Sequence, residues 1–284
     1  MDKNNTLLLD TGNLLFERYK EHETDIYAKK SQIITDAMNL MGYDAANLGA
    51  GDIYPDMQFL EQRCKDAQFA IISANAKVFG CEQNPVQKYV IKEINGIRIG
   101  ITGVIPGFEN NLLDRTFHFD DPATALEEIM PDLAEKTDFI ILLSQFNYQD
   151  TRDLLNRVPG VDLGLCVDAL RMPLPGSAED KAKEQGLSAL MNITIKGMEI
   201  GVLNIEKANG RVSIKSAEII YLDQKVPADE KLLEVARQFE KWEKDKKTRE
   251  MKKKLMERRK LMKNLELTPE EFFNQNEPSG KEKQ

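Results

Sequence analysis

The fold is decided by two short stretches, Leu7–Phe16 (LLLDTGNLLF) and Leu48–Asp52 (LGAGD). Each is an apolar run that ends in a turn of small residues carrying an Asp or an Asn. In α/β enzymes, such turns at the carboxyl ends of strands hold the residues of the site. The two turns are about forty residues apart, which fits one strand–helix–strand unit with generous loops. The sequence therefore predicts that both turns lie at the same edge of a sheet.

The rest of the chain predicts two kinds of sheet with helices outside them. Up to residue 167, apolar strand-length runs alternate with segments of helical periodicity, typical of βα units. Within this part, Asn95-Gly96 joins two apolar runs, which is the strongest short signal for a hairpin. After it, residues 190–195, 199–205 and 212–221 are expected to form antiparallel strands joined by Gly-containing turns. The mixture favours a pair of sheets flanked by helices over a purely doubly wound fold.

Composition narrows the class of protein. The 284 residues are 41% hydrophobic with a mean hydropathy of −0.46, and no apolar run approaches the roughly 18–20 residues that cross a bilayer. The first residues, MDKNN, lack the pattern of a signal peptide, so we expect a cytoplasmic protein, or an extracytoplasmic one if a leader has been removed. Residues 1–225 hold 34 acidic and 23 basic side chains, which argues against binding to nucleic acid.

The last part of the chain, residues 226–284, differs in composition and is predicted to be a charged helical extension with a disordered end. It holds 16 basic and 13 acidic residues. Trp242, Met251, Leu255 and Met262 form a sparse apolar stripe that either faces solvent beside its charged neighbours or contacts a partner helix. We therefore expect a protein partner or self-association through this helix.

Several blocks together resemble the 5′-nucleotidase-like branch of the calcineurin-like metallophosphoesterases. The blocks occur in the family's order: LLLDTGNLLF, MNLMGYDAANLGAGD, FAIISANA, YVIKEINGIRIGITGVIP, FIILLSQFNYQD and VPGVDLGLCVDAL. The resemblance covers roughly residues 5–240. It implies an αββα four-layer sandwich of two mixed sheets in residues 1–225, with two divalent metals at the sheet tips and water attacking a phosphate ester.

The metal-binding motifs of that family are altered in this chain. The family's first strand, with an Asp-x-His motif, has no counterpart and is expected to be missing. The Gly-Asp of the next block is Gly12-Asn13, and Gly-Asn-His-Asp/Glu has become Gly49-Ala50-Gly51-Asp52. A Ser-His pair is Ser144-Gln145, and Gly-His-x-His is replaced by residues 167–170, Val-Asp-Ala-Leu. The chain has only two histidines, and neither falls at a ligand position.

A pair of metal ions needs several converging carboxylates and imidazoles to bridge it. We therefore predict a non-catalytic phosphoesterase-fold module with no catalytic residues and no cofactor, which acts as a protein-binding or structural component. Its vestigial pocket would contain Asp10, Asn13, Asp52, Gln145 and Asp168. The alternative is a divergent metal-dependent phosphoesterase or 5′-nucleotidase that holds a single Mg²⁺, Mn²⁺ or Ca²⁺, with Asp52 and Asp168 as weak candidate ligands.

Overall fold

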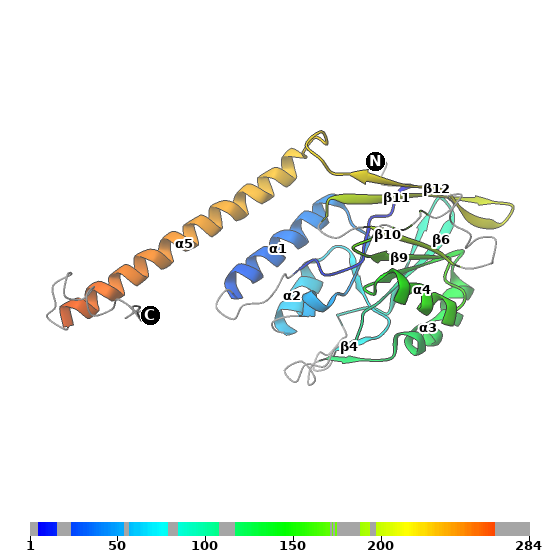
Figure 1. Cartoon of the computed structure of the whole chain (residues 1–284), viewed down its shortest axis with the longest axis horizontal. Coiled ribbons are helices and arrows are strands. Elements are labelled where there is room, and N and C mark those ends of the chain that lie inside the picture. The colour runs from blue at the N-terminus through cyan, green and yellow to red at the C-terminus, as the bar shows by residue number, and fades with distance from the viewer. Residues whose placement is uncertain are drawn as a thin grey trace, which may run out of the picture. The chain divides into compact units, whose positions relative to one another are not determined.

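A computed structural model describes residues 5–15, 24–53, 57–78, 85–107, 117–170, 172, 174, 188–193 and 197–264 (Figure 1). The chain divides into two compact units, Met1–Leu232 and Leu233–Gln284. The described strands and helices α1 to α4 belong to the first unit. The predicted domain boundary after residue 225 stays a prediction. The expected disordered end lies outside the described residues.

The first sheet is parallel and contains the two stretches that open the sequence. Its order is β1-β2-β3, formed by Leu9–Asp10, Ala45–Asn47 and Ala70–Ile72. Helices α1 (Thr24–Met41) and α2 (Met57–Asp66) connect these strands. The turns after β1 and β2 consequently meet at the same edge of the sheet, as the sequence predicts.

The second sheet has the strand order β10-β9-β8-β6-β5. Its strands are β5 (Tyr89–Ile94), β6 (Ile97–Val104), β8 (Phe139–Ser144), β9 (Leu163–Val167) and β10 (Ala189–Ile193). The Asn95-Gly96 hairpin between β5 and β6 is confirmed, since both residues have positive φ, 50° and 73°. The remaining neighbours in this sheet pair in parallel.

Two capped helices lie on the outer face of the second sheet. Helix α3 (Pro122–Lys136) begins at Asp121, whose side chain accepts a hydrogen bond from the Thr124 amide at 2.9 Å. Helix α4 (Tyr148–Arg157) begins at Asn147, which caps the Asp150 amide in the same way at 2.9 Å. These caps satisfy amides that have no partner inside the first turn of a helix.

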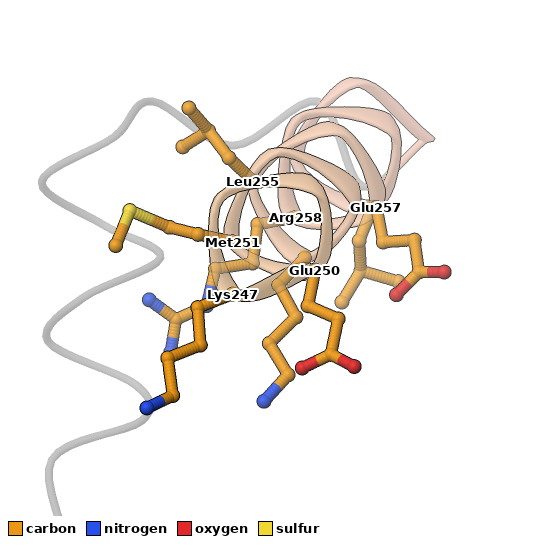
Figure 2. A pocket seen from close by; sticks show the side chains of 8 residues that line it. Lys247, Glu250, Met251, Leu255, Glu257 and Arg258 are labelled. Atoms are coloured by element: carbon orange, nitrogen blue, oxygen red, sulfur yellow. The ribbon is translucent and has the colours of Figure 1, made fainter. Parts of the chain in front are cut away.

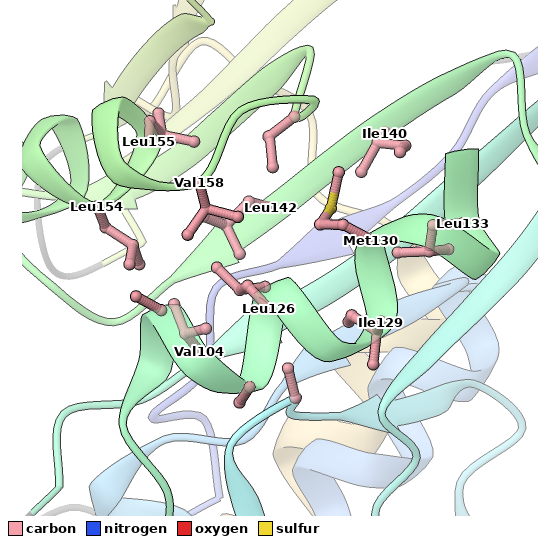
Figure 3. Close-up of a cluster of buried hydrophobic side chains, with 14 of the residues drawn as sticks. Val104, Leu126, Ile129, Met130, Leu133, Ile140, Leu142, Leu154, Leu155 and Val158 are labelled. Atoms are coloured by element: carbon pink, nitrogen blue, oxygen red, sulfur yellow. The ribbon is translucent and has the colours of Figure 1, made fainter.

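Three buried clusters separate four layers, and the alternation of side chains along the strands explains this order. Ile140 and Leu142 of β8 point to α3 and α4, in the cluster that Figure 3 shows, whereas Ile141 and Leu143 point to the first sheet. In β2, Ala45 packs between the sheets. The side chain of the next residue, Ala46, packs in the cluster with residues of α1 and α2. The αββα sandwich that the sequence predicts is therefore confirmed.

One of the expected strand pairings is wrong. The sequence predicts three successive antiparallel strands, but β10 pairs in parallel with β9 inside the second sheet. Of these three strands, β11 (Glu199–Ala208) and β12 (Arg211–Tyr221) pair antiparallel to one another. A further antiparallel pair, β4 (Ala76–Val78) with β7 (Phe117–Phe119), was not predicted. Apolar alternation shows that a strand exists but does not show which neighbour it joins.

The charged segment near the end of the chain forms one continuous helix, α5, over Glu230–Asn264. The side chain of Trp242 is used within this helix, because its ring stacks on Phe239, with centroids 6.1 Å apart, and lies 5.7 Å from the Lys246 ammonium. Met251 and Leu255 are 71% and 49% exposed. The side chain of Met262 lies outside the described residues.

The packing of β8 predicts a large loss of stability when one of its inner side chains is shortened. Leu142 is fully buried, so Leu142→Ala is expected to lower the free energy of unfolding by about 2–5 kcal/mol. Urea denaturation followed by circular dichroism measures this loss. Leu255→Ala is the matched control, because that side chain is exposed, and it should change stability by less than about 0.5 kcal/mol. Equal effects of the two changes would contradict the described core.

Candidate functional site

The candidate site is the edge of the first sheet where the turns after β1 and β2 meet. The turn after β2 continues into a short 3₁₀ helix, Ala50–Ile53. Asp52 in this helix is only 3% exposed. Its Oδ2 atom accepts hydrogen bonds from the amides of Asn13 and Gly49, both at 2.9 Å, and its Oδ1 atom accepts one from Leu15 at 2.7 Å. The Asp52 carboxylate thus joins the two turns to each other.

A chain of side-chain amides extends this connection to the second sheet. Asn13 has a left-handed backbone with φ of 64°, and its Oδ1 atom accepts a hydrogen bond from the Gly51 amide at 2.7 Å. The Asn13 Nδ2 atom donates to Gln145, which follows β8, and the Gln145 Nε2 atom donates to the carbonyl of Thr11. Three of the predicted pocket residues are therefore brought together, but they bind one another and the backbone.

The turns approach so closely that the glycines between them are required. A Cβ atom on Gly49 would lie 2.2 Å from the Asn13 amide nitrogen, and one on Gly12 would lie 2.6 Å from the Asn47 carbonyl oxygen. Gly12 also has a φ of 103°, which other residues rarely adopt. These two glycines therefore permit the contact that Asp52 and Asn13 stabilise.

Asp10 is adjacent to this network and belongs to the turn after β1. Its Oδ1 atom accepts a hydrogen bond from the Gly12 amide at 2.7 Å. Burial raises the pKa of Asp10 to about 6, and the charge of Asp52 acts in the same direction. Burial also raises the pKa of Asp52 to about 6, against the opposing effect of the backbone hydrogen bonds to Leu15, Gly49 and Asn13.

Within the described part of the chain, Asp168 makes no hydrogen bond to this network. It follows β9, and its Oδ2 atom accepts a hydrogen bond from the amide of Tyr148 at 2.9 Å, at the start of α4. Its Oδ1 atom accepts one from Leu170 at 3.2 Å. These bonds lower the pKa of Asp168, which keeps the carboxylate charged. Asp168 therefore fixes the loop after β9 to the first turn of α4.

Two features of the site were not predicted from the sequence, and both involve Asn47. This residue, at the end of β2, is 1% exposed and donates from Nδ2 to the carbonyls of Thr11 at 3.2 Å and Val104 at 2.9 Å. The Thr11 carbonyl therefore accepts from both Asn47 and Gln145. An Asn inside the apolar run that precedes Leu48–Asp52 is the signal that could have indicated a buried polar contact.

The donor set does not fit a pair of metal ions of the kind the resemblance implies. Across the described ranges, no group of three or more His, Cys, Asp or Glu side chains is arranged so that it could hold a metal ion. Both oxygens of Asp52 accept backbone amides in a buried position, and Asn13 cannot supply a bridging carboxylate. No step of a reaction can therefore be assigned to metals at this edge from these residues.

Comparisons with known proteins establish the relationship. The trifunctional nucleotide phosphoesterase YfkN of Bacillus subtilis (strain 168) is 28% identical over 246 residues, which cover 72% of this chain and 17% of that protein. The chain is homologous to the calcineurin-like phosphoesterases of the 5′-nucleotidase branch. Protein UshA of Yersinia enterocolitica is 27% identical over 153 residues, which cover 50% of this chain and 28% of UshA. The chain thus spans less than a third of either relative.

A solved structure shows the same fold. The crystal structure of the calcineurin-like phosphoesterase YfkN from Bacillus subtilis superposes with a TM-score of 0.65 at 23% identity, covering 83% of each chain. No family model matches the sequence.

The prediction that the protein uses no cofactor is contradicted by this homology. YfkN is a trifunctional nucleotide phosphoesterase of the calcineurin-like class, the class for which the sequence resemblance implies hydrolysis with divalent metals. A divalent metal is therefore the cofactor that the homology implies. The loss of the family's ligand residues from these loops does not by itself show that no ion is used.

The network at Asp52 predicts that an isosteric amide is not tolerated. In Asp52→Asn, one of the two oxygens becomes an NH₂ group that faces a backbone N–H, so a buried donor loses its acceptor. We expect a loss of about 1–3 kcal/mol in the free energy of unfolding. Urea denaturation measures it, and Asp168→Asn, which changes a less buried helix cap, should cost no more than about 1 kcal/mol. A stable Asp52→Asn protein would contradict the proposed junction of the two turns.

The raised pKa values of Asp10 and Asp52 predict how stability depends on pH. The ordinary pKa of these groups is 3.8 and the folded value is about 6, so between these values the folded state holds protons that the unfolded chain has released. The free energy of unfolding should therefore fall as pH rises through about 6.

Asp10→Asn tests whether the raised pKa of Asp10 causes this pH dependence. The variant removes the titrating group, and its amide oxygen can still accept the hydrogen bond from the Gly12 amide. The variant should be more stable than the unmodified protein by about 1–2 kcal/mol at about pH 8, with a flatter profile down to about pH 5. Urea denaturation at several pH values gives the two curves. Parallel curves would show that Asp10 does not carry the effect.

Proposed function

We propose that this protein is a non-catalytic module of the phosphoesterase fold that acts as a binding or structural component. The observation that carries the proposal is the bonding of Asp52, the carboxylate that remains in the third sequence block. A catalytic carboxylate has to face a metal or a substrate, whereas this one is buried and accepts backbone amides from both turns. The side chains of Asn13 and Gln145 are likewise bound to each other.

The second candidate function is a divergent metal-dependent phosphoesterase, and the homology to nucleotide phosphoesterases favours it. In that case Asp168, with Asp52, Asn13 or Gln145, would hold a single Mg²⁺, Mn²⁺ or Ca²⁺. The bonds of Asp168 to the start of α4 and to Leu170 weigh against this role, because each of its oxygens already accepts one backbone amide.

Binding is assigned to α5 in this proposal. Met251 and Leu255 are exposed on this helix. Among the described helices, none is long and apolar enough to cross a membrane. A protein partner or self-association through this helix remains the prediction from the sequence. An extracytoplasmic location is part of the proposal too.

Turnover of phosphate esters separates the two candidate functions. The protein is incubated with p-nitrophenyl phosphate and with AMP in the presence of Mn²⁺, Mg²⁺ or Ca²⁺, and YfkN serves as the positive control. We expect no phosphate release above the background without protein. Metal-dependent turnover that disappears in Asp52→Ala and Asp168→Ala would overturn the non-catalytic proposal and establish the alternative.

A further inference from the structure

Helix α5 carries a concentration of positive charge that the average of the terminal segment conceals. Residues 241–263 contain 12 Lys or Arg side chains and 4 Asp or Glu side chains, so this part of the helix has a net charge of +8. The whole chain has a net charge of −8. The positive charge is therefore local to about six turns of one helix, with about 3.6 residues per turn.

An apolar stripe lies within the same segment. Met251, Leu255 and Leu261 are 71%, 49% and 49% exposed. At about 100° per residue, these three positions fall within an arc of about 120°. Figure 2 shows Met251 and Leu255 projecting from the same side of α5, with Lys247 and Arg258 beside them. Many of the other cations, among them Lys253 and Lys260, fall on the opposite side by the same geometry.

The positive charge of residues 241–263 disfavours the association of α5 with α5 of a second copy. Two parallel or antiparallel copies in contact would bring two +8 segments within a helix diameter of about 10 Å, which is close to the Debye length of about 8 Å in physiological salt. The three apolar side chains of the stripe are too few to offset this repulsion. A second copy of α5 is therefore a poor occupant of the stripe.

The stripe also argues against nucleic acid and against a protein groove. Phosphate contacts use cations and leave Met251, Leu255 and Leu261 in water. A protein groove contacts only one side of a helix. Here the cations surround the helix, so a groove on one side would leave most of them without acidic partners.

We propose that residues 241–263 of α5 bind an anionic lipid surface, with the helix lying in the plane of the headgroups. Met251, Leu255 and Leu261 enter the boundary of the acyl chains. Lys247, Lys254 and Arg258 lie between them on the same face and extend their long side chains to the lipid phosphates. The cations on the far side are still within about one Debye length of the surface and are attracted to it. This inference rests on the assignment of binding to α5, but it replaces the protein partner or second copy expected there with a lipid surface. It is independent of whether the body is catalytic.

Co-sedimentation of the full chain with lipid vesicles tests the proposal. The vesicles are phosphatidylcholine alone, or phosphatidylcholine with about one third phosphatidylglycerol, at about 0.1 M and about 0.5 M sodium chloride. We expect binding to the anionic vesicles at low salt, at least tenfold weaker binding at high salt, and little binding to the neutral vesicles. Equal binding to the two compositions, or no binding at all, would overturn the proposal.

Three variants, matched in size, separate charge from apolar contact. The charge variant K252Q/K253Q/K260Q and the stripe variant M251Q/L255Q/L261Q should each bind anionic vesicles at least about tenfold more weakly. The control R211Q/K215Q/K225Q removes three cations from the body and should bind within about threefold of the unmodified chain. Gln is a good helix former, so circular dichroism should report the same helix content in all of them. A control variant as weak as the charge variant would overturn the local role of α5.

Competition with duplex DNA of about thirty base pairs addresses the other polyanion. We expect the stripe variant to lose vesicle binding and the DNA to compete weakly with vesicles for the unmodified chain. If the DNA displaces the vesicles completely and the stripe variant binds DNA as well as the unmodified chain does, the segment is a nucleic-acid site and the proposal is wrong. Phosphoesterase turnover is measured on the same samples, so a failure of the non-catalytic proposal is seen separately.

Discussion

The site edge of this protein depends on one buried carboxylate. Asp52 accepts amides from the turn after β1 and from the turn after β2, and these are the turns that hold ligands in the family the chain resembles. Removing a charge from water costs free energy unless hydrogen bonds replace the lost hydration. The backbone amides replace part of it, since burial still raises the pKa of Asp52 to about 6. Gly12 and Gly49 allow the close approach, and the Asn13–Gln145 contact extends it to the second sheet. The geometry of this edge therefore depends on the Asp52 carboxylate, which faces the backbone amides of the two turns.

Much of the fold could be predicted because the signals are local. The run Leu7–Asp10, the Asn95-Gly96 turn and the helical periodicity of residues 24–41 each specify an element without reference to the rest of the chain. The parallel pairing of β10 with β9 could not be predicted in this way, since strand alternation is the same in parallel and antiparallel neighbours. At the site, the convergence of Asn13, Asp52 and Gln145 followed from the order of the motifs. The direction of each hydrogen bond, and the role of Asn47 beneath the turns, depend on contacts between residues far apart in sequence.

The homology of the chain and the side chains at its candidate site point to different functions. The homology identifies a phosphoesterase ancestry and implies a divalent metal, whereas the side chains at the sheet edge bind one another. These observations address different questions: ancestry concerns the 72% of the chain that matches YfkN, and the donor set concerns one edge of one sheet. A fold is kept by its core, and the four-layer packing does not depend on which side chains stand at the edge of the first sheet. Such a scaffold can keep its shape while its surfaces take up other roles. In this chain, helix α5 carries positive charge, whereas residues 1–225 are acidic.

The shortness of β1 has a consequence for colloidal behaviour. It is the outermost strand of the first sheet and has two residues, Leu9 and Asp10. An outer strand offers its unpaired peptide groups to any extended chain that meets it, so a long one is a template for cross-β association. Two residues give too few peptide groups to hold a foreign strand, so this edge is a poor template for cross-β association.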